Sequence, residues 1–131
     1  MKLKFTAFTL IELMVVILIV GILAAASVPL MRGRIDSSKW AEANAGAGAI
    51  RTAMRNCFVK TGSTLTGTLN DASVLQALEF VSGDLTGTYF TEADYEIISV
   101  NGDGVAVITV TGSQGNAPSG SKTLALDGSF K

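Results

Sequence analysis

The chain has 131 residues, of which 48% are hydrophobic and 16% charged, and its formal net charge at pH 7 is −1. This length suits one domain, and the composition is too apolar for a disordered protein. The near-neutral charge gives no basic field for nucleic acid, and histidine, the commonest general base and metal ligand, is absent. The one cysteine, Cys57, excludes an internal disulfide and a thiolate zinc site. These absences exclude most familiar active sites, although they do not exclude every enzyme. We expect a protein that is not an enzyme, with no metal or cofactor site, and we do not expect nucleic acid as its main partner.

The apolar residues are concentrated near the N-terminus, after a short segment, residues 1–7, that carries Lys2 and Lys4. Residues 8–31 contain a single charge, Glu12. As a helix this segment would be about 36 Å long, enough to cross a bilayer core of about 30 Å. We expect it to span a membrane. Pro29 should kink the helix rather than end it, because helical patterning resumes beyond it.

Residues 30–60 predict an amphipathic continuation of the same helix. Apolar residues recur there at spacings of three and four, and charged residues fall largely off this stripe. Gly62 is a suitable C-terminal stop. The predicted helix therefore runs from Phe8 to about Lys60, apolar all round in its first half and one-sided in its second. The stripe consists of Trp40, Ala43, Ala47, Ile50, Met54 and Cys57.

The rest of the chain predicts a small antiparallel sheet. Residues 71–81 predict a short helix with Asp71 or Ser73 as N-cap. The β-branched runs 95–100 and 105–111 flank the turn residues 101–104 and predict a hairpin, and residues 122–126 predict a further strand. Because no disulfide can hold it, the tail 127–131 should be held by strand pairing. The expected fold class is α+β, with residues 32–131 forming a head in which the amphipathic half of the helix packs on the sheet.

Glu12 is the most informative single residue. A carboxylate inside an apolar span costs on the order of 2.5–3.5 kcal/mol on insertion scales, so it should have a partner. Thr9 and Glu12 have the spacing of a capping box at a helix start. If Lys2 and Lys4 are removed, no basic residue of the same chain reaches Glu12. We therefore favour a positive charge from another copy as its partner, and this role is compatible with capping.

The string Phe8-Thr-Leu-Ile-Glu-Leu-Met, with Gly21 and Pro29 at matching offsets, closely resembles the N-terminal signature of type IV pilins and of the type II secretion and competence pseudopilins. The resemblance implies a pilin-like fold and a prepilin peptidase that cuts between Ala7 and Phe8 and methylates the new Phe8 amine. It implies that Glu12 pairs with the amine of a neighbouring subunit. It also makes Gly21–Pro29 the region where the helix can loosen. Ala7 departs from the glycine usual before the cut, and we expect cleavage to persist.

The expected function is that of a filament subunit serving adhesion, motility or DNA uptake. By resemblance, the precursor spans the inner membrane once with its N-terminus inside. The product is a homo-oligomeric filament, on the cell surface or as a periplasmic pseudopilus, assembled by a platform protein and a motor ATPase. Two alternatives stay open at this point. One is a pseudopilin of type II secretion or competence; the other is a Sec-secreted binding module, cleaved after Ala26 in the small-residue run Ala24–Ser27.

Overall fold

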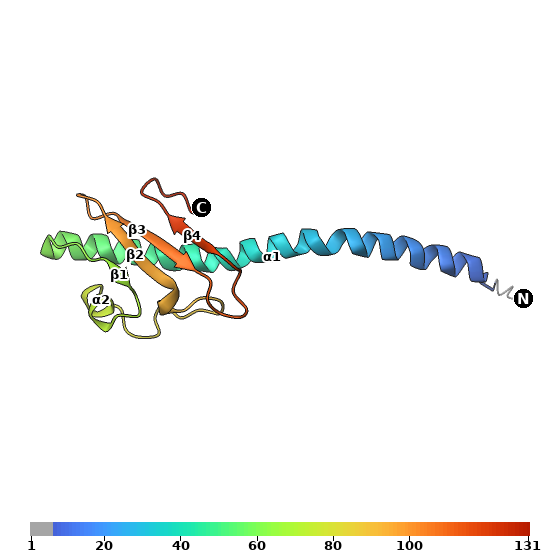
Figure 1. Ribbon diagram of the computed structural model, residues 1–131, viewed down its shortest axis with the longest axis horizontal. Helices are drawn as coiled ribbons and strands as arrows, with labels where there is room; N and C mark the ends of the chain where they lie inside the picture. Colours follow the sequence, from blue (N-terminus) through green and yellow to red (C-terminus); the bar gives the residue numbers. More distant parts are fainter. Residues whose placement is uncertain (1–6) are drawn as a thin grey trace, which may run out of the picture. The chain divides into compact units, whose positions relative to one another are not determined.

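The computed structural model describes residues 7–131 (Figure 1). Of the predicted leader, residues 1–6, with Lys2 and Lys4, lie outside the described residues. The chain divides into two compact units, one ending at Asp36 and the other comprising Ser37–Lys131. One helix, α1 (Leu10–Thr61), contributes to both units.

In the first unit α1 follows the predicted span closely. The helix begins at Leu10 rather than Phe8 and continues through Pro29. None of its most apolar 18-residue window is buried, although this window has a mean hydropathy of 2.8. Among the described residues, α1 is the one helix long and apolar enough to cross a membrane. The prediction of a long apolar N-terminal helix is confirmed.

In the second unit the predicted stripe of α1 forms one wall of the core. Ala43, Ala47, Ile50 and Met54 are completely buried, and Trp40 and Cys57 at the two ends of the stripe are partly buried against them. The helix ends one residue later than predicted, at Thr61. Gly62 follows with a φ of 67°, and its amide donates to the Phe58 carbonyl at 2.8 Å. Gly62 therefore ends the helix as predicted, because a glycine adopts this left-handed conformation without steric cost.

The other wall of the core is a four-stranded antiparallel sheet in the order β1-β2-β3-β4 (Figure 1). Its strands are β1 (Gly67–Thr68), β2 (Tyr95–Val100), β3 (Ala106–Thr111) and β4 (Ser121–Leu124). The predicted hairpin is confirmed, whereas no sequence signal predicts the two-residue β1. Alternate residues of β2 and β3 point into the core, among them Tyr95, Ile97, Ile108 and Val110. The α+β fold with a helix on an antiparallel sheet is therefore confirmed.

The C-terminal tail pairs with the sheet. Strand β4 ends at Leu124, two residues before the predicted end, because the chain turns back at Gly128 and forms a bridge between Leu124 and Phe130. Thr123 and Lys131 exchange two backbone hydrogen bonds, of 2.7 and 3.1 Å. Strand pairing thus holds the tail, as predicted. The same contacts cover the outer edge of β4, which would otherwise present unpaired backbone groups.

The predicted helix at 71–81 is real but shorter, α2 (Ala72–Ala77). Asp71 is the N-cap and accepts a hydrogen bond from the Ser73 amide at 2.8 Å, and the hydrogen bonds from Ser73 lower the pKa of the Asp71 carboxyl. The helix closes early because Glu79 adopts a left-handed conformation with φ of 62°, and the Phe80 amide donates to the Leu75 carbonyl at 2.9 Å. This Schellman-type closure has no glycine, so the sequence contains no residue that predicts it.

Polar side chains of α1 tie the loops and strands to the helix. Arg51 Nη2 donates to the carbonyls of Leu124 and Ala125 at 2.9 and 2.6 Å, and its Nε donates to the Ala106 carbonyl at 3.0 Å. Glu42 Oε1 accepts from the Tyr89 amide at 2.8 Å. The apolar pattern placed both charged residues off the stripe and assigned them no role. In the structure they satisfy backbone groups at the edge of the core.

Tyr95 lies in the core of the second unit and is 2% exposed. A short 3-10 helix, η1 (Glu92–Asp94), precedes it and buries Asp94, which accepts a hydrogen bond from the Ser113 amide at 3.1 Å. Burial raises the pKa of the Tyr95 hydroxyl to about 12, and the nearby Glu42 and Asp94 add to the shift. These groups contribute to packing and to loop closure.

Candidate functional site

The predicted cleavage point lies just before the helix. Ala7 and Phe8 precede Leu10, the first residue of α1, and both side chains are exposed, that of Phe8 by 72%. A peptidase must take its substrate in a non-helical conformation to reach both sides of the peptide bond. The Ala7–Phe8 bond is accessible in this respect. Its cleavage stays a prediction.

Glu12 and Thr9 form a capping box. The Glu12 amide donates to Thr9 Oγ1 at 3.3 Å, and the Thr9 amide and hydroxyl each donate to Glu12 Oε2 at 3.4 Å. These hydrogen bonds are long and therefore weak, and the Glu12 side chain is exposed. Within residues 7–131 no cation lies within ion-pair distance of its carboxylate. Capping therefore leaves the charge of Glu12 without a counter-ion in the described part of the chain.

Gly21 and Pro29 lie inside α1, on either side of the small-residue run 24–27. A Cβ added to Gly21 would meet nothing within 4 Å, so no contact within the described chain requires a glycine there. Pro29 has no amide hydrogen and cannot donate to the carbonyl of Ala25. Ser27 Oγ donates to the Leu23 carbonyl at 2.8 Å, a contact that competes with the helical backbone bonds. These features weaken the helix locally, and the loosening itself stays a prediction.

The apolar surface of this segment is not covered by any other part of residues 7–131. Leu10, Ile11 and Leu30, for example, are 77%, 70% and 69% exposed. A monomer in water does not maintain an exposed apolar surface of this extent. Lipid or other protein chains must therefore cover residues 10–31.

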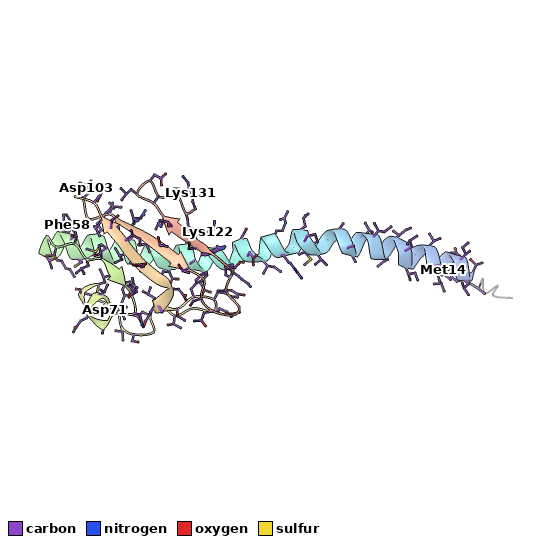
Figure 2. All side chains as sticks on the ribbon, in the orientation of Figure 1. Met14, Phe58, Asp71, Asp103, Lys122 and Lys131 are labelled. Atoms are coloured by element: carbon purple, nitrogen blue, oxygen red, sulfur yellow. The ribbon has the colours of Figure 1, made fainter. Side chains whose placement is uncertain are left out.

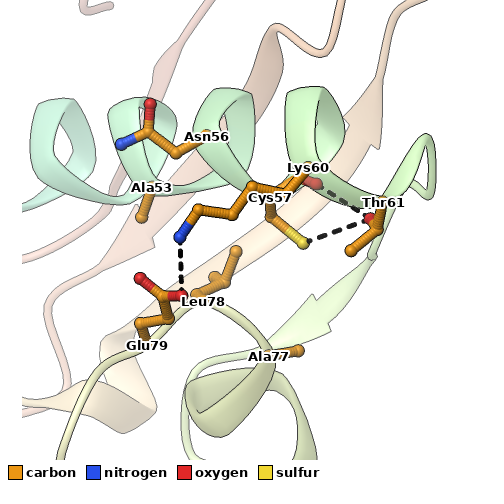
Figure 3. Close-up of a pocket in the computed structure, with 8 residues that line it drawn as sticks. All are labelled: Ala53, Asn56, Cys57, Lys60, Thr61, Ala77, Leu78 and Glu79. Atoms are coloured by element: carbon orange, nitrogen blue, oxygen red, sulfur yellow. Dashed lines mark hydrogen bonds and ion pairs between the residues drawn. The ribbon is translucent and has the colours of Figure 1, made fainter.

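A separate pocket of about 230 Å³ lies in the second unit, between the end of α1 and α2 (Figure 3). Lys60 and Glu79 form an ion pair of 2.7 Å at its mouth, and both side chains are largely exposed. The thiol of Cys57 lies 3.8 Å from Thr61 Oγ1. The polar contacts of this pocket thus join Lys60 to Glu79 and Cys57 to Thr61. Within the described residues no group of three or more His, Cys, Asp or Glu side chains could hold a metal ion.

Comparison with known protein families points to the N-terminal segment. The family described as the prokaryotic N-terminal methylation motif matches residues 3–28, a range that contains the Ala7–Phe8 bond, Glu12 and Gly21. No solved structure matches the chain. The matched residues coincide with the exposed apolar part of α1 and the segment before it, and the sequence resemblance rests on the same residues. The chain therefore carries the prepilin-type signature shared by type IV pilins and pseudopilins.

Proposed function

We propose that this chain is a structural filament subunit that prepilin peptidase cleaves between Ala7 and Phe8 and methylates at Phe8. The observation that carries the proposal is an apolar helix surface that nothing in residues 7–131 covers, with one carboxylate, Glu12, in its first turn that has no counter-ion among those residues. The methylation motif matches the same segment. No enzymatic activity and no cofactor belong to this proposal.

Two contributions to the free energy determine assembly, one from the apolar helix surface and one from the charged groups. Apolar helix surface is well shielded in lipid, and it is shielded to a similar degree in a bundle of helices, so moving the helix from one to the other costs little in hydrophobic free energy. A charge is different, because it is expensive in both environments unless it is paired. The Glu12 carboxylate therefore favours the one axial register in which a cation of another copy meets it.

Cleavage would create that cation. In the uncut chain the nitrogen of Phe8 is part of a peptide bond and carries no charge. After cleavage it is an amine, and a methylated amine keeps its positive charge at neutral pH. The positive end of the α1 dipole disfavours this amine at its own helix start and favours the Glu12 carboxylate there. Pairing between the Phe8 amine of one copy and Glu12 of the next satisfies both groups.

The resemblance to type IV pilins and pseudopilins supplies the cellular setting of this proposal. The precursor spans the inner membrane once through residues 10–31, and a platform protein with a motor ATPase supplies the work of extraction. The product is a pilus on the cell surface or a periplasmic pseudopilus, since the methylation motif is common to both classes. A Sec-secreted module released after Ala26 has less support, because residues 24–27 are helical within α1 and the matched motif extends to residue 28.

The mass of the mature chain and electron microscopy of surface fibres test the proposal. We expect the isolated subunit to begin with methylated Phe8 and to be the main component of fibres sheared from cells. A chain that starts at Met1 in assembled material, or at Ser27 in the medium, would overturn it. Stranding of a secreted enzyme in a deletion strain, without long fibres in the wild type, would identify the pseudopilin alternative.

A further inference from the structure

A groove of about 340 Å³ lies in the second unit, beside the first α1 residues of that unit. Trp40 and Phe130 form its apolar part, with ring centroids 6.1 Å apart in an edge-to-face arrangement. Lys122 Nζ lies 5.9 Å from the Trp40 centroid and 5.7 Å from the Phe130 centroid. The rings attract the ammonium and hold it at one place in the groove. Asn44 adds an amide at the rim.

The charge of Lys122 is not neutralised within the described chain. Lys122 precedes buried Leu124 by two residues on β4, so its side chain lies on the core-facing side of the sheet. Its burial is intermediate, and among residues 7–131 no carboxylate lies within ion-pair distance of its Nζ. The ammonium of Lys122 is half-buried, has three hydrogen-bond donors and lies against two aromatic rings. It is therefore suited to donate a hydrogen bond to an anionic oxygen.

An acid with no cation at ion-pair distance among the described residues lies at the opposite end of the same unit. Asp103 occupies the turn between β2 and β3, and Figure 2 shows it near Phe58 at the far end of the unit from the side where Lys122 lies. The Asp103 amide donates to Asn101 Oδ1 at 3.0 Å, and Gly104 packs so closely on Phe58 that an added Cβ would lie 2.7 Å from that side chain. The turn therefore presents its exposed carboxylate from a fixed position.

We propose that the groove at Lys122, Trp40 and Phe130 receives the Asp103 turn of a second copy of this chain. The inference rests on the proposed filament function and names a contact between its heads. Because the two surfaces lie at opposite ends of one unit, they cannot meet within a chain, and a head-to-tail contact between copies repeats without closing into a dimer. Complementary charges at such a contact fix which surfaces meet more than they add affinity.

The helix sets the axial distance of this contact. Gly104 packs on Phe58, and the groove is built on Trp40, which is 18 residues earlier in α1. At about 1.5 Å per residue, the two surfaces differ in height by about 27 Å along the helix. The head contact therefore joins copies that are displaced by about 27 Å along this part of the helix.

The alternative occupant is an anionic lipid surface, and the charge of the second unit disfavours it. Residues 37–131 contain six basic and nine acidic residues, a net charge of −3, so the unit as a whole is repelled by an anionic bilayer. Two copies also repel each other through this net charge, but their contact is confined to one turn and one groove, where a single carboxylate on a fixed turn matches one fixed ammonium.

Charge reversal in the full chain tests the contact through the yield of sheared surface fibres. We expect Lys122→Glu and Asp103→Lys each to lower this yield about tenfold, and the double variant to restore at least half of it. Lys122→Met keeps the apolar stem and should lie between. Glu96→Lys, a reversal at an exposed position of β2, is the matched control and should assemble normally. Denaturation followed through Trp40, the only tryptophan, checks that each variant folds.

A zero-length carbodiimide crosslink gives a second readout on wild-type fibres. The reagent joins an amine to a carboxylate as an amide with loss of water, and it acts only on groups already in contact. We expect a peptide pair joining Lys122 to Asp103 in fibres and none in detergent-dispersed subunits.

The outcomes separate this inference from the proposed function. Fibres that depend on Glu12 but tolerate both charge reversals, or that give no Lys122–Asp103 crosslink, overturn the head contact alone. A wild-type chain that forms no surface fibres, and whose deletion strands no secreted enzyme, overturns both. A Trp40 emission shift on anionic vesicles that Lys122→Glu abolishes, together with unchanged fibre yield, assigns the groove to lipid and also overturns the contact.

Discussion

The two parts of α1, before and after Ser37, have the same helical geometry but differ in what covers their apolar surface. From Ser37 onward the apolar face of the helix is covered by the sheet, and Ala43, Ala47, Ile50 and Met54 are completely buried. In the part that ends at Asp36, none of the most apolar window is buried. A helix with a covered face stabilises one fold, whereas a helix with an uncovered apolar face needs lipid or another protein chain to cover it.

The difference is also visible in the charged groups. In the second unit Arg51 donates to three carbonyls and Glu42 accepts from the backbone of the loop at Tyr89. In the first unit Glu12 has only the weak contacts to Thr9 among the described residues. We infer that Arg51 and Glu42 serve the fold of the second unit, and that Glu12 in the apolar span serves assembly.

The largest effect is expected at Glu12. Glu12→Ala should lower the yield of sheared fibres about tenfold or more, because it leaves the Phe8 amine unpaired in the helix bundle. Glu12→Gln keeps an acceptor for the Thr9 amide but removes the charge, and it should fail to a similar degree. Thr9→Val removes the capping hydroxyl and keeps the charge, so it should assemble. Normal yield from Glu12→Gln would assign Glu12 to capping alone.

Truncation of one isoleucine in each part of α1 tests this difference through the free energy of unfolding. Ile50→Ala should lower the free energy of unfolding of the second unit by about 2–5 kcal/mol, because Ile50 is completely buried. Ile17→Ala, at a position 68% exposed, should leave that free energy unchanged. Denaturant titration of the full chain in detergent, followed by Trp40 fluorescence, measures both. An equal loss in the two variants would mean that the halves of α1 unfold as one unit.

A pair of arginine truncations should give a smaller difference. Arg51→Ala removes the donors for three carbonyls and should cost about 2 kcal/mol in the same titration. Arg55→Ala, one turn later at an exposed position of α1, should cost less than about 0.5 kcal/mol. Similar losses would show that the Arg51 contacts add little beyond helix propensity.

Alanine substitutions at two glycines of α1 should change the free energy of unfolding in opposite directions, and these are the smallest effects that we expect. A Cβ at Gly46 would overlap the Tyr95 hydroxyl, so Gly46→Ala should destabilise the second unit by about 1–2 kcal/mol. A Cβ at Gly48 meets nothing within 4 Å, so Gly48→Ala should stabilise it by about 0.5–1 kcal/mol. If Gly48→Ala also lowers fibre yield, another copy approaches α1 closely at that position.

Elements whose signals are local could be predicted from the amino-acid sequence. The spacing of apolar residues predicted the buried stripe of α1, Gly62 predicted its end, and the β-branched runs around the turn at 101–104 predicted the hairpin. The isolated acid Glu12 led to the hypothesis that its partner lies on another copy, because the cost of burying a charge does not depend on the rest of the fold, and that hypothesis stays a prediction.

Features that depend on distant groups became visible in the folded chain alone. The pairing of β1 with β2, the closure of α2 at Glu79, the carbonyl contacts of Arg51 and the position of Lys122 beside Trp40 and Phe130 are of this kind. The strand pairing and the contacts of Arg51 and Lys122 join residues far apart in the sequence, and the closure at Glu79 uses a backbone conformation that its residue type does not favour. Each depends on where the sheet and loops lie against the helix, and spacing along one segment carries no information about that.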